Sequence, residues 1–148
     1  MSLVWRKARL GDLRTIIALI RQDARTPPDE GTDYDRLEEA FRAVSERDDA
    51  FLIVGEDEGV VIATYQLFII EAVSISAPRR GQIEDVRVDE GQRRKGVGAA
   101  LMADAESRAH AAGATLVQLM SSQTRHGTHV FYETLGYERS HFGFKKRL

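Results

Sequence analysis

The junction at residues 83–112 constrains the fold more than any other part of the chain. At the end of the run Ile83-Glu84-Asp85-Val86-Arg87-Val88, the apolar residues Val86 and Val88 alternate with a polar one, as in a strand. Three cations follow at 93–95, and Gly96-Val97-Gly98 then opens an Ala-rich segment with helical spacing. Glycines let backbone N–H groups approach a ligand, and a helix N-terminus adds unpaired donors and the positive end of a dipole. We therefore expect a polyanion such as pyrophosphate to bind where the strand gives way to the helix.

Two common phosphate-binding loops do not fit this junction. A Walker loop ends in Gly-Lys-Ser/Thr, whereas Gly98 is followed by two alanines. A Rossmann fingerprint requires a third glycine where this chain has Leu101, and an acidic residue on the next strand, which the run TLVQLMSS lacks. The junction taken alone leaves open a plainer interpretation, in which an exposed basic turn precedes an ordinary helix.

The bulk properties exclude several classes of protein. The 148 residues are enough for one core and predict a single domain over 1–148, and 43% hydrophobic with 30% charged residues is a globular balance. A net charge of -2 argues against nucleic-acid binding. No apolar run approaches the roughly 20 residues that span a bilayer, and the N-terminus lacks an apolar signal core, so we expect a cytoplasmic protein that does not bind membranes. The absence of cysteine excludes disulfides and thiolate metal sites.

Periodicity predicts the element order β-α-α-β-β-β-α-β-α-β. Strands are expected at 3–9, 51–56, 60–70, 82–88 and 115–122, with a last extended piece at 137–148. Helices are expected from the N-cap Asp12 through Ala24, around 37–44, at 96–112 and at 128–135, with a loop at 25–35. The second and third strands should form a hairpin through Asp57-Glu58-Gly59. The fold class is α/β (α+β), with a mixed, mostly antiparallel central sheet of about six to seven strands and helices on both faces.

Two motifs resemble the GNAT N-acetyltransferase superfamily. A strand of the type apolar-Glu-x-apolar-x-Val, followed by Arg93-Arg94-Lys95-Gly96-Val97-Gly98, resembles its acyl-CoA signature. Downstream, FYETLGYERS resembles its Phe-Tyr-x-x-x-Gly-Phe/Tyr motif, and one helix and one strand separate the two, as in the family. The resemblance covers nearly the whole chain. It implies a GNAT-like sheet splayed between strands 4 and 5, and an enzyme that transfers acetyl from acetyl-CoA directly to a primary amine of a small molecule or protein.

The resemblance also implies how acetyl-CoA, the co-substrate, is held. Its pantetheine arm would lie between the fourth and fifth strands and pair with backbone groups of Val86 and Val88, and the amides from Arg94 to Ala99 would hold the pyrophosphate. The implied cofactor-binding residues are Val86, Arg87, Val88, Arg93, Arg94, Lys95, Gly96, Val97, Gly98, Ala99 and Arg125. No metal is expected, because His126 and His129 have a chelating spacing but no acidic or Cys partner nearby in the sequence.

Glu84 and Tyr132 are the catalytic residues that the resemblance implies. An alkylammonium, with a pKa near about 10, must lose a proton before it attacks, and Glu84 occupies the acidic position of the family's fourth strand. Asp85 is the alternative base; strand alternation puts the two carboxylates on opposite faces unless a bulge intervenes. Tyr132 matches the tyrosine that returns a proton to the CoA thiolate. Backbone N–H groups around Val86 are candidates for stabilising the oxyanion.

The chain departs from the family pattern at two places. Glu90 stands where the family often has proline, which we expect to be harmless. Arg125 or His126 stands where it often has asparagine, so an Asn contact to the cofactor does not carry over, although Arg125 could reach a pyrophosphate.

Several other residues are candidates to face the acceptor amine. They are Tyr65, Gln66, His141 and the acidic stretch 27–39. Relatives that pair through their C-terminal strands suggest a homodimer through 137–148. A non-catalytic acyl-CoA-binding sensor or regulator is the alternative function, and a nucleotide-phosphate-binding protein is disfavoured by the missing loop residues.

Overall fold

The computed structural model describes residues 1–22 and 31–148, in two compact units. The first unit, Met1–Gln118, holds most of the sheet and the helices packed on it. The second unit, Leu119–Leu148, holds helix α4 (His126–Thr134). Ala24 and the first part of the predicted loop at 25–35 lie outside the described residues.

The sheet of the described residues has five strands in the order β1-β2-β3-β4-β5. They are β1 (Leu3–Lys7), β2 (Ala50–Asp57), β3 (Val60–Glu71), β4 (Arg79–Val88) and β5 (Val117–Leu119). The pairs β1–β2, β2–β3 and β3–β4 are antiparallel, which confirms the mostly antiparallel class. The predicted count of six to seven strands is wrong. Residues 137–148 form no strand, because their Phe142 and Phe144 are 81% and 93% exposed and bury no apolar face.

The β2–β3 hairpin forms as predicted. Asp57 pairs with Val60, so Glu58 and Gly59 make a two-residue loop. Their φ angles of 50° and 81° are both positive, as a type I′ turn requires. This turn matches the right-handed twist of the strands, and it sets their register as far as the irregularity between Gly55 and Glu56.

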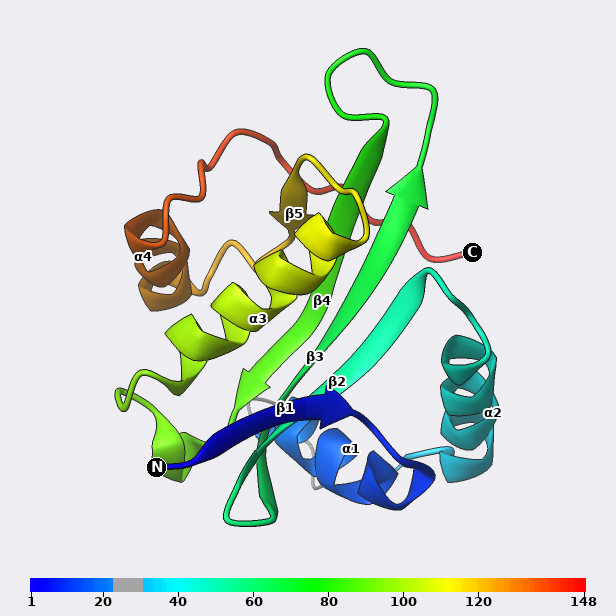
Figure 1. The fold of residues 1–148 in the computed structure, drawn as a ribbon, viewed down its shortest axis with the longest axis vertical. Coiled ribbons are helices and arrows are strands. Elements are labelled where there is room, and N and C mark those ends of the chain that lie inside the picture. The colour runs from blue at the N-terminus through cyan, green and yellow to red at the C-terminus, as the bar shows by residue number, and fades with distance from the viewer. Residues whose placement is uncertain (23–30) are drawn as a thin grey trace. The chain divides into compact units, whose positions relative to one another are not determined.

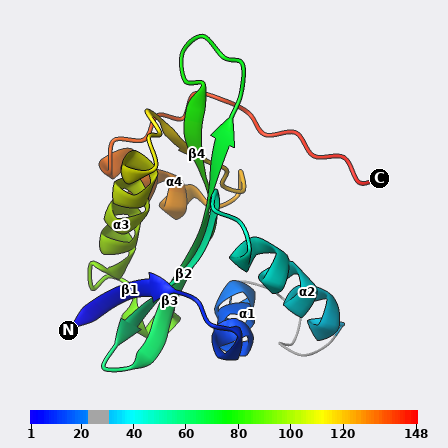
Figure 2. The same ribbon diagram turned by 45° about the vertical axis from the view of Figure 1, so that its right-hand side comes forward.

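Helices cover both faces of the sheet in the first unit, which confirms the expected layers. In Figures 1 and 2, α3 (Val97–Ala111) lies on one face, and α1 (Leu13–Arg21) and α2 (Tyr34–Ser45) lie on the other. Short 3-10 turns, η1 (Leu10–Asp12) and η2 (Glu90–Gln92), precede α1 and α3. No helix among residues 1–22 and 31–148 combines the length and apolarity needed to cross a membrane.

The α3 face of the sheet holds the larger part of the core. Val97, Leu101, Ala105 and Ala109 are buried, as the predicted stripe requires, whereas Ala112 is half-buried. They pack against the side chains of β3 and β4, of which Leu67 and Ile83 are almost fully buried. A Cβ at Gly81 would lie 3.1 Å from both Ala109 Cβ and Leu67 Cδ1, so a larger residue there would push α3 away from β4. The alanines of α3 and this glycine together allow a close approach of helix and sheet.

The opposite face is covered by the amphipathic helix α1 and by α2. Leu13 and Ile17 form a buried cluster with Phe41 of α2. Asp12 was expected to cap α1, but its carboxylate makes no such bond. It accepts hydrogen bonds from Arg6 Nη1 and from the Arg9 backbone N–H, both at 2.7 Å, and the Arg6 bond lowers the pKa of Asp12. The cap fails because a cation on β1 competes for the carboxylate.

A polar network also ties α3 to the sheet. Tyr65 is fully buried on β3, and its hydroxyl donates to Asp104 Oδ2 at 2.5 Å. Arg108 Nε donates to the same oxygen at 2.8 Å, and Arg108 Nη2 donates to the Trp5 carbonyl of β1 at 3.4 Å. Burial and the Asp104 carboxylate raise the pKa of Tyr65, so the phenol stays protonated and keeps donating. The network therefore joins β1, β3 and α3.

The turn between β4 and α3 uses left-handed backbone. Asp89 accepts the Gly91 N–H at 2.9 Å and so closes η2. Arg94 and Gly96 follow with φ angles of 63° and 82°, and α3 begins at Val97. A Cβ at Gly96 would meet nothing within 4 Å, so glycine is favoured there by backbone conformation and not by crowding.

We expect Tyr65→Phe to lower the free energy of unfolding by about 1–3 kcal/mol, because it removes a donor from a partly buried carboxylate. Urea denaturation of the Tyr65→Phe, Asp104→Ala and double variants measures this loss and its coupling to Asp104. The Tyr65→Phe loss should shrink in the Asp104→Ala background. An equal loss in both backgrounds would show that the phenol acts through other contacts.

We expect Gly96→Ala to lower the free energy of unfolding by about 1–2 kcal/mol, because an L-residue is strained at this φ. Gly11→Ala is the matched control: a Cβ at Gly11 also meets nothing within 4 Å, and its φ is not in the left-handed region. Chemical denaturation should leave Gly11→Ala within about 0.5 kcal/mol of the parent. Equal effects of the two substitutions would contradict the conformational explanation.

Candidate functional site

Strand β4 carries a bulge at the predicted catalytic position. Gln66 of β3 pairs with Glu84, and the next pair along the ladder is Thr64 with Arg87. Two residues of β4, Asp85 and Val86, therefore stand opposite the single residue Tyr65. Asp85 has a φ of 47°, in the left-handed region that non-glycine residues rarely adopt. The bulge interrupts the strand alternation on which the sequence argument relied.

The bulge changes which side chains share a face of the sheet. Val88, opposite Ala63, lies on the α3 face with Ile83, although the two are five residues apart. Arg87 shares the opposite face with Glu84, and its Nε approaches the Ile20 carbonyl of α1 at 3.5 Å. Gln66, also on this face, donates its side-chain amide to Asp85 Oδ2 at 2.9 Å. The carboxylates of Glu84 and Asp85 therefore both reach the α1 face, because the bulge intervenes.

Side-chain amides surround these carboxylates. Gln118 Nε2 donates to Gln82 Oε1 at 2.7 Å, and Gln82 Nε2 donates to Glu84 Oε1 at 3.2 Å. The first bond orients the Gln82 amide so that its NH2 group faces Glu84. Gln82 and Gln118 were not among the site residues predicted from the sequence. The available signal was that Gln82 precedes Glu84 by two residues, and so shares its face of the strand.

The end of β4 leads into a basic turn and the N-terminus of α3. Arg93, Arg94, Lys95 and Gly96 are exposed. Lys95 Nζ donates to Gln92 Oε1 at 3.0 Å, which leaves two of its protons for other acceptors. In the part of the chain that the structure describes, no side chain caps the N-terminus of α3, and Val97 is buried and offers its backbone only. First-turn N–H groups without a cap, next to cations, fit a pyrophosphate.

The start of β4 and the segment before β5 are joined by backbone hydrogen bonds. Thr115 N–H donates to the Arg79 carbonyl at 3.1 Å, and Gly81 N–H donates to the Leu116 carbonyl at 2.9 Å. These bonds are at the opposite end of β4 from Val86 and Val88. The Arg87 guanidinium donates to the Val86 carbonyl at 2.8 Å, so a ligand would share that carbonyl with this side chain.

The second unit holds Tyr132 and Arg125. Tyr132 lies in α4, with its ring centroid 5.2 Å from that of Phe131 and 5.8 Å from that of Tyr137. Arg125 is the residue immediately before α4. His129 Nε2 lies 2.7 Å from the Ser122 carbonyl, so this nitrogen carries the proton and donates. Across residues 1–22 and 31–148, no three His, Asp or Glu side chains are grouped as metal ligands.

The residues predicted to face the acceptor amine lie in different parts of the structure. Tyr65 is buried in the network under α3, whereas Gln66 lies on the α1 face and bonds Asp85. His141 is exposed and contacts Ser140 Oγ at 2.7 Å. Of the acidic stretch 27–39, the first four residues lie outside the described ranges, and Asp33 caps α2 through the Arg36 N–H at 3.0 Å.

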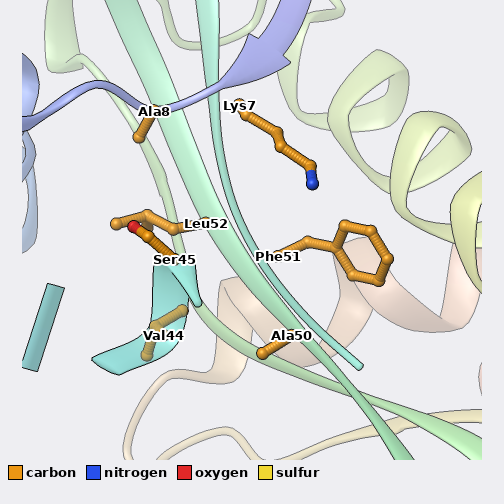
Figure 3. Close-up of a pocket in the computed structure, with 7 residues that line it drawn as sticks. All are labelled: Lys7, Ala8, Val44, Ser45, Ala50, Phe51 and Leu52. Carbon is orange, nitrogen blue, oxygen red and sulfur yellow. The ribbon is translucent and has the colours of Figure 1, made fainter. Parts of the chain in front are cut away.

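A small hollow of about 70 Å³ lies between the β1–β2 edge and the C-terminal end of α2 (Figure 3). Lys7 Nζ lies 5.4 Å from the centre of the Phe51 ring, and Ser45 Oγ donates to the Phe41 carbonyl at 2.8 Å. The hollow is otherwise lined by aliphatic side chains and brings no carboxylate to the surface. The chemistry of this hollow does not suit acyl transfer.

The chain is similar in sequence to a named acetyltransferase and similar in fold to several solved structures. A segment of 68 residues is 40% identical to an aminoalkylphosphonate N-acetyltransferase of Salmonella typhimurium (strain LT2), over 46% of this chain and 44% of that protein. The match thus spans less than half of that relative. A crystal structure described as a transcriptional regulator from Bacillus halodurans C-125 has a TM-score of 0.90 at 26% identity, over 99% of this chain and all of that one. Glucosamine-6-phosphate N-acetyltransferase from Arabidopsis thaliana has a TM-score of 0.81 at 27% identity, over 99% of each chain.

The model of the acetyltransferase (GNAT) family matches residues 14–137. This range includes the bulge, the basic turn and α4, and it crosses the boundary between the two units. It contains both motifs on which the sequence resemblance rests. The chain therefore belongs to the GNAT acetyltransferase family.

Proposed function

We propose that the chain is an acetyl-CoA-dependent N-acetyltransferase of the cytoplasm that acts on a primary amine of a small molecule or protein. One observation carries the proposal: a single strand presents Glu84 beside a bulge, and a basic turn then leads from its end at Val88 to the start of α3 at Val97, which no side chain of the described residues caps. We also propose that the two units form one catalytic domain over 1–148. The family match supports this, because it runs across their boundary.

Acetyl-CoA binding is assigned to β4 and to the turn that follows it. The backbone amides of residues 94–99 would accept the pyrophosphate, with Arg93, Arg94 and Lys95 adding charge-assisted contacts. Backbone groups of Val86 and Val88 would pair with pantetheine amides. Arg87 enters this set through its backbone, because its side chain is engaged with the carbonyls of Val86 and Ile20. Arg125 is the further candidate for the pyrophosphate.

The reaction is the aminolysis of a thioester. The alkylammonium gives one proton to Glu84, directly or through a water, and the amine nitrogen then attacks the thioester carbonyl carbon. The new C–N bond forms, the C–S bond breaks, and Tyr132 gives its proton to the thiolate sulfur. The second proton lost from the nitrogen restores the Tyr132 hydroxyl. The products are the N-acetyl amide, CoA thiol and one proton released to solvent. Tyr132 receives this role from the family motif.

The chemical class of the acceptor amine is suggested by the names of two relatives. Relatives named for an aminoalkylphosphonate and for glucosamine 6-phosphate suggest small amines that carry an anionic group. A panel of such amines, together with polyamines, amino acids and peptide amines, would identify the class through thiol release from acetyl-CoA. We further propose a homodimer through 137–148, supported by the exposed Phe142 and Phe144, and testable by sedimentation.

A second candidate function is a non-catalytic acyl-CoA-binding regulator. The structural relative with a TM-score of 0.90 is described as a transcriptional regulator, which favours this alternative. The two functions differ in one measurement. A regulator would bind CoA by calorimetry but would release no thiol from acetyl-CoA with any amine of the panel.

We expect Glu84→Gln to lower kcat by about 100-fold or more, because a neutral amide cannot accept the ammonium proton. Tyr132→Phe should lower kcat by at least about tenfold, because the thiolate loses its proton donor. Both variants should bind CoA within threefold of the parent by calorimetry. Full activity in both variants would exclude the proposed proton transfers.

We expect Arg94→Gln to raise the KM for acetyl-CoA by about tenfold and to leave kcat nearly unchanged, because it removes a uniform binding contact to phosphate. Steady-state kinetics at two salt concentrations tests this, since added salt should raise the KM of the parent more than that of the variant. Arg36→Gln, an exposed cation on α2, is the matched control. Equal effects of the two substitutions would place the pyrophosphate elsewhere.

A further inference from the structure

We propose that Gln66 is a positioning residue that holds the β4 bulge through Asp85, and that Asp85 thereby serves the backbone while Glu84 accepts the proton. The inference rests on the proposed function and deepens it. It assigns different roles to two neighbouring carboxylates that the sequence motif alone leaves as alternatives.

The backbone at Asp85 needs a restraint. A φ of 47° costs an L-residue about 1–2 kcal/mol relative to ordinary strand geometry, although Asp tolerates it better than most. Such conformations persist where the surrounding structure holds them, and they are concentrated at functional sites. The extra residue of a bulge also lacks its share of the ladder hydrogen bonds. A side-chain bond from the neighbouring strand can supply the missing restraint.

Gln66 is placed to supply that restraint. It stands directly opposite Glu84 in the β3–β4 register, yet its amide reaches along the strand and donates to Asp85 Oδ2 at 2.9 Å. Both side chains are half-buried, so water competes weakly for this bond. The bond ties β3 to the first residue of the bulge and occupies one oxygen of the Asp85 carboxylate.

Glu84 is in a different position. It lies in the regular part of the ladder, and its amide contact at 3.2 Å comes from Gln82 of its own strand. That bond restrains no residue with a positive φ. The Glu84 carboxylate is therefore held in place without being required for the backbone conformation, as a residue that must accept and release a proton should be.

The bulge determines which side chains of β4 face α1 and which face α3. Without the bulge, side chains would alternate strictly along β4. Either Glu84 would then face α3, or Val86 and Val88 would face α1. The bulge allows Ile83 and Val88 to pack under α3 while Glu84 and Arg87 face α1. Gln66, by holding the bulge, keeps the proposed base and the proposed pantetheine strand in one arrangement.

A double-mutant cycle on Gln66 and Asp85 tests the proposal. Gln66→Met removes the donor at similar size and should lower kcat/KM by about tenfold. In the Asp85→Gly background the same substitution should cost less than about twofold, because glycine adopts this φ without a restraint. The exposed Gln123→Met variant is the control for the change of residue type. An equal loss in both backgrounds would overturn the proposal.

The pH profile separates positioning from proton transfer. We expect Asp85→Gly to keep the acidic limb of the kcat/KM profile, because the proposed base Glu84 is still present, whereas Glu84→Gln should abolish that limb. If Asp85→Gly abolished the limb and Glu84→Gln retained it, Asp85 would be the base and the assignment would be wrong.

A measurement without substrate keeps this proposal distinct from the proposed function. Amide hydrogen exchange at residues 84–87 should be faster in Gln66→Met, and should return to the Asp85→Gly rate in the double variant. If the parent released no thiol with any amine but showed this exchange pattern, the enzymatic proposal would fail and the bulge restraint would stand. Unchanged exchange in Gln66→Met would overturn the restraint itself.

Discussion

The packing of α3 across β3 and β4 is the contact on which the rest of the structure depends. Its alanine stripe and Gly81 bring helix and sheet close together, and the Tyr65–Asp104–Arg108 network fixes how the helix lies along the strands. The N-terminus of the same helix is the candidate anion site. A core contact and the proposed ligand contact therefore share one rigid element, which would position a bound phosphate precisely.

The bulge in β4 reconciles two demands on one strand. Ile83 and Val88 must face α3, with Ile83 buried and Val88 half-buried, while polar groups must reach the opposite face. A regular strand with this spacing cannot meet both demands, because its side chains alternate strictly. One extra residue at a positive φ resolves the conflict, and the Gln66–Asp85 bond stabilises it. The strained residue Asp85 thus lies directly beside Glu84, the proposed base.

On the α1 face, the carboxylates of Glu84 and Asp85 accept hydrogen bonds from glutamine side chains. Gln118, Gln82 and Gln66 donate in turn to Gln82, Glu84 and Asp85. Neutral donors orient carboxylates without the full charge of an arginine or lysine, so a cationic acceptor would meet no competing cation from these three side chains. This arrangement agrees with an amine substrate on that face of the sheet.

The sequence by itself determined the layers, the hairpin turn and the order of the elements, because hydrophobic period and turn residues are local properties of the chain. It also marked the basic turn and Gly96, since a left-handed glycine before an Ala-rich helix can be read from neighbouring residues. It failed at the C-terminal strand and at the Asp12 cap, where the outcome depends on distant partners. Only the tertiary structure decided that Glu84 and Asp85 share a face and that Gln66 reaches Asp85. A bulge arises from the pairing of two strands, and the alternation within one strand does not encode it.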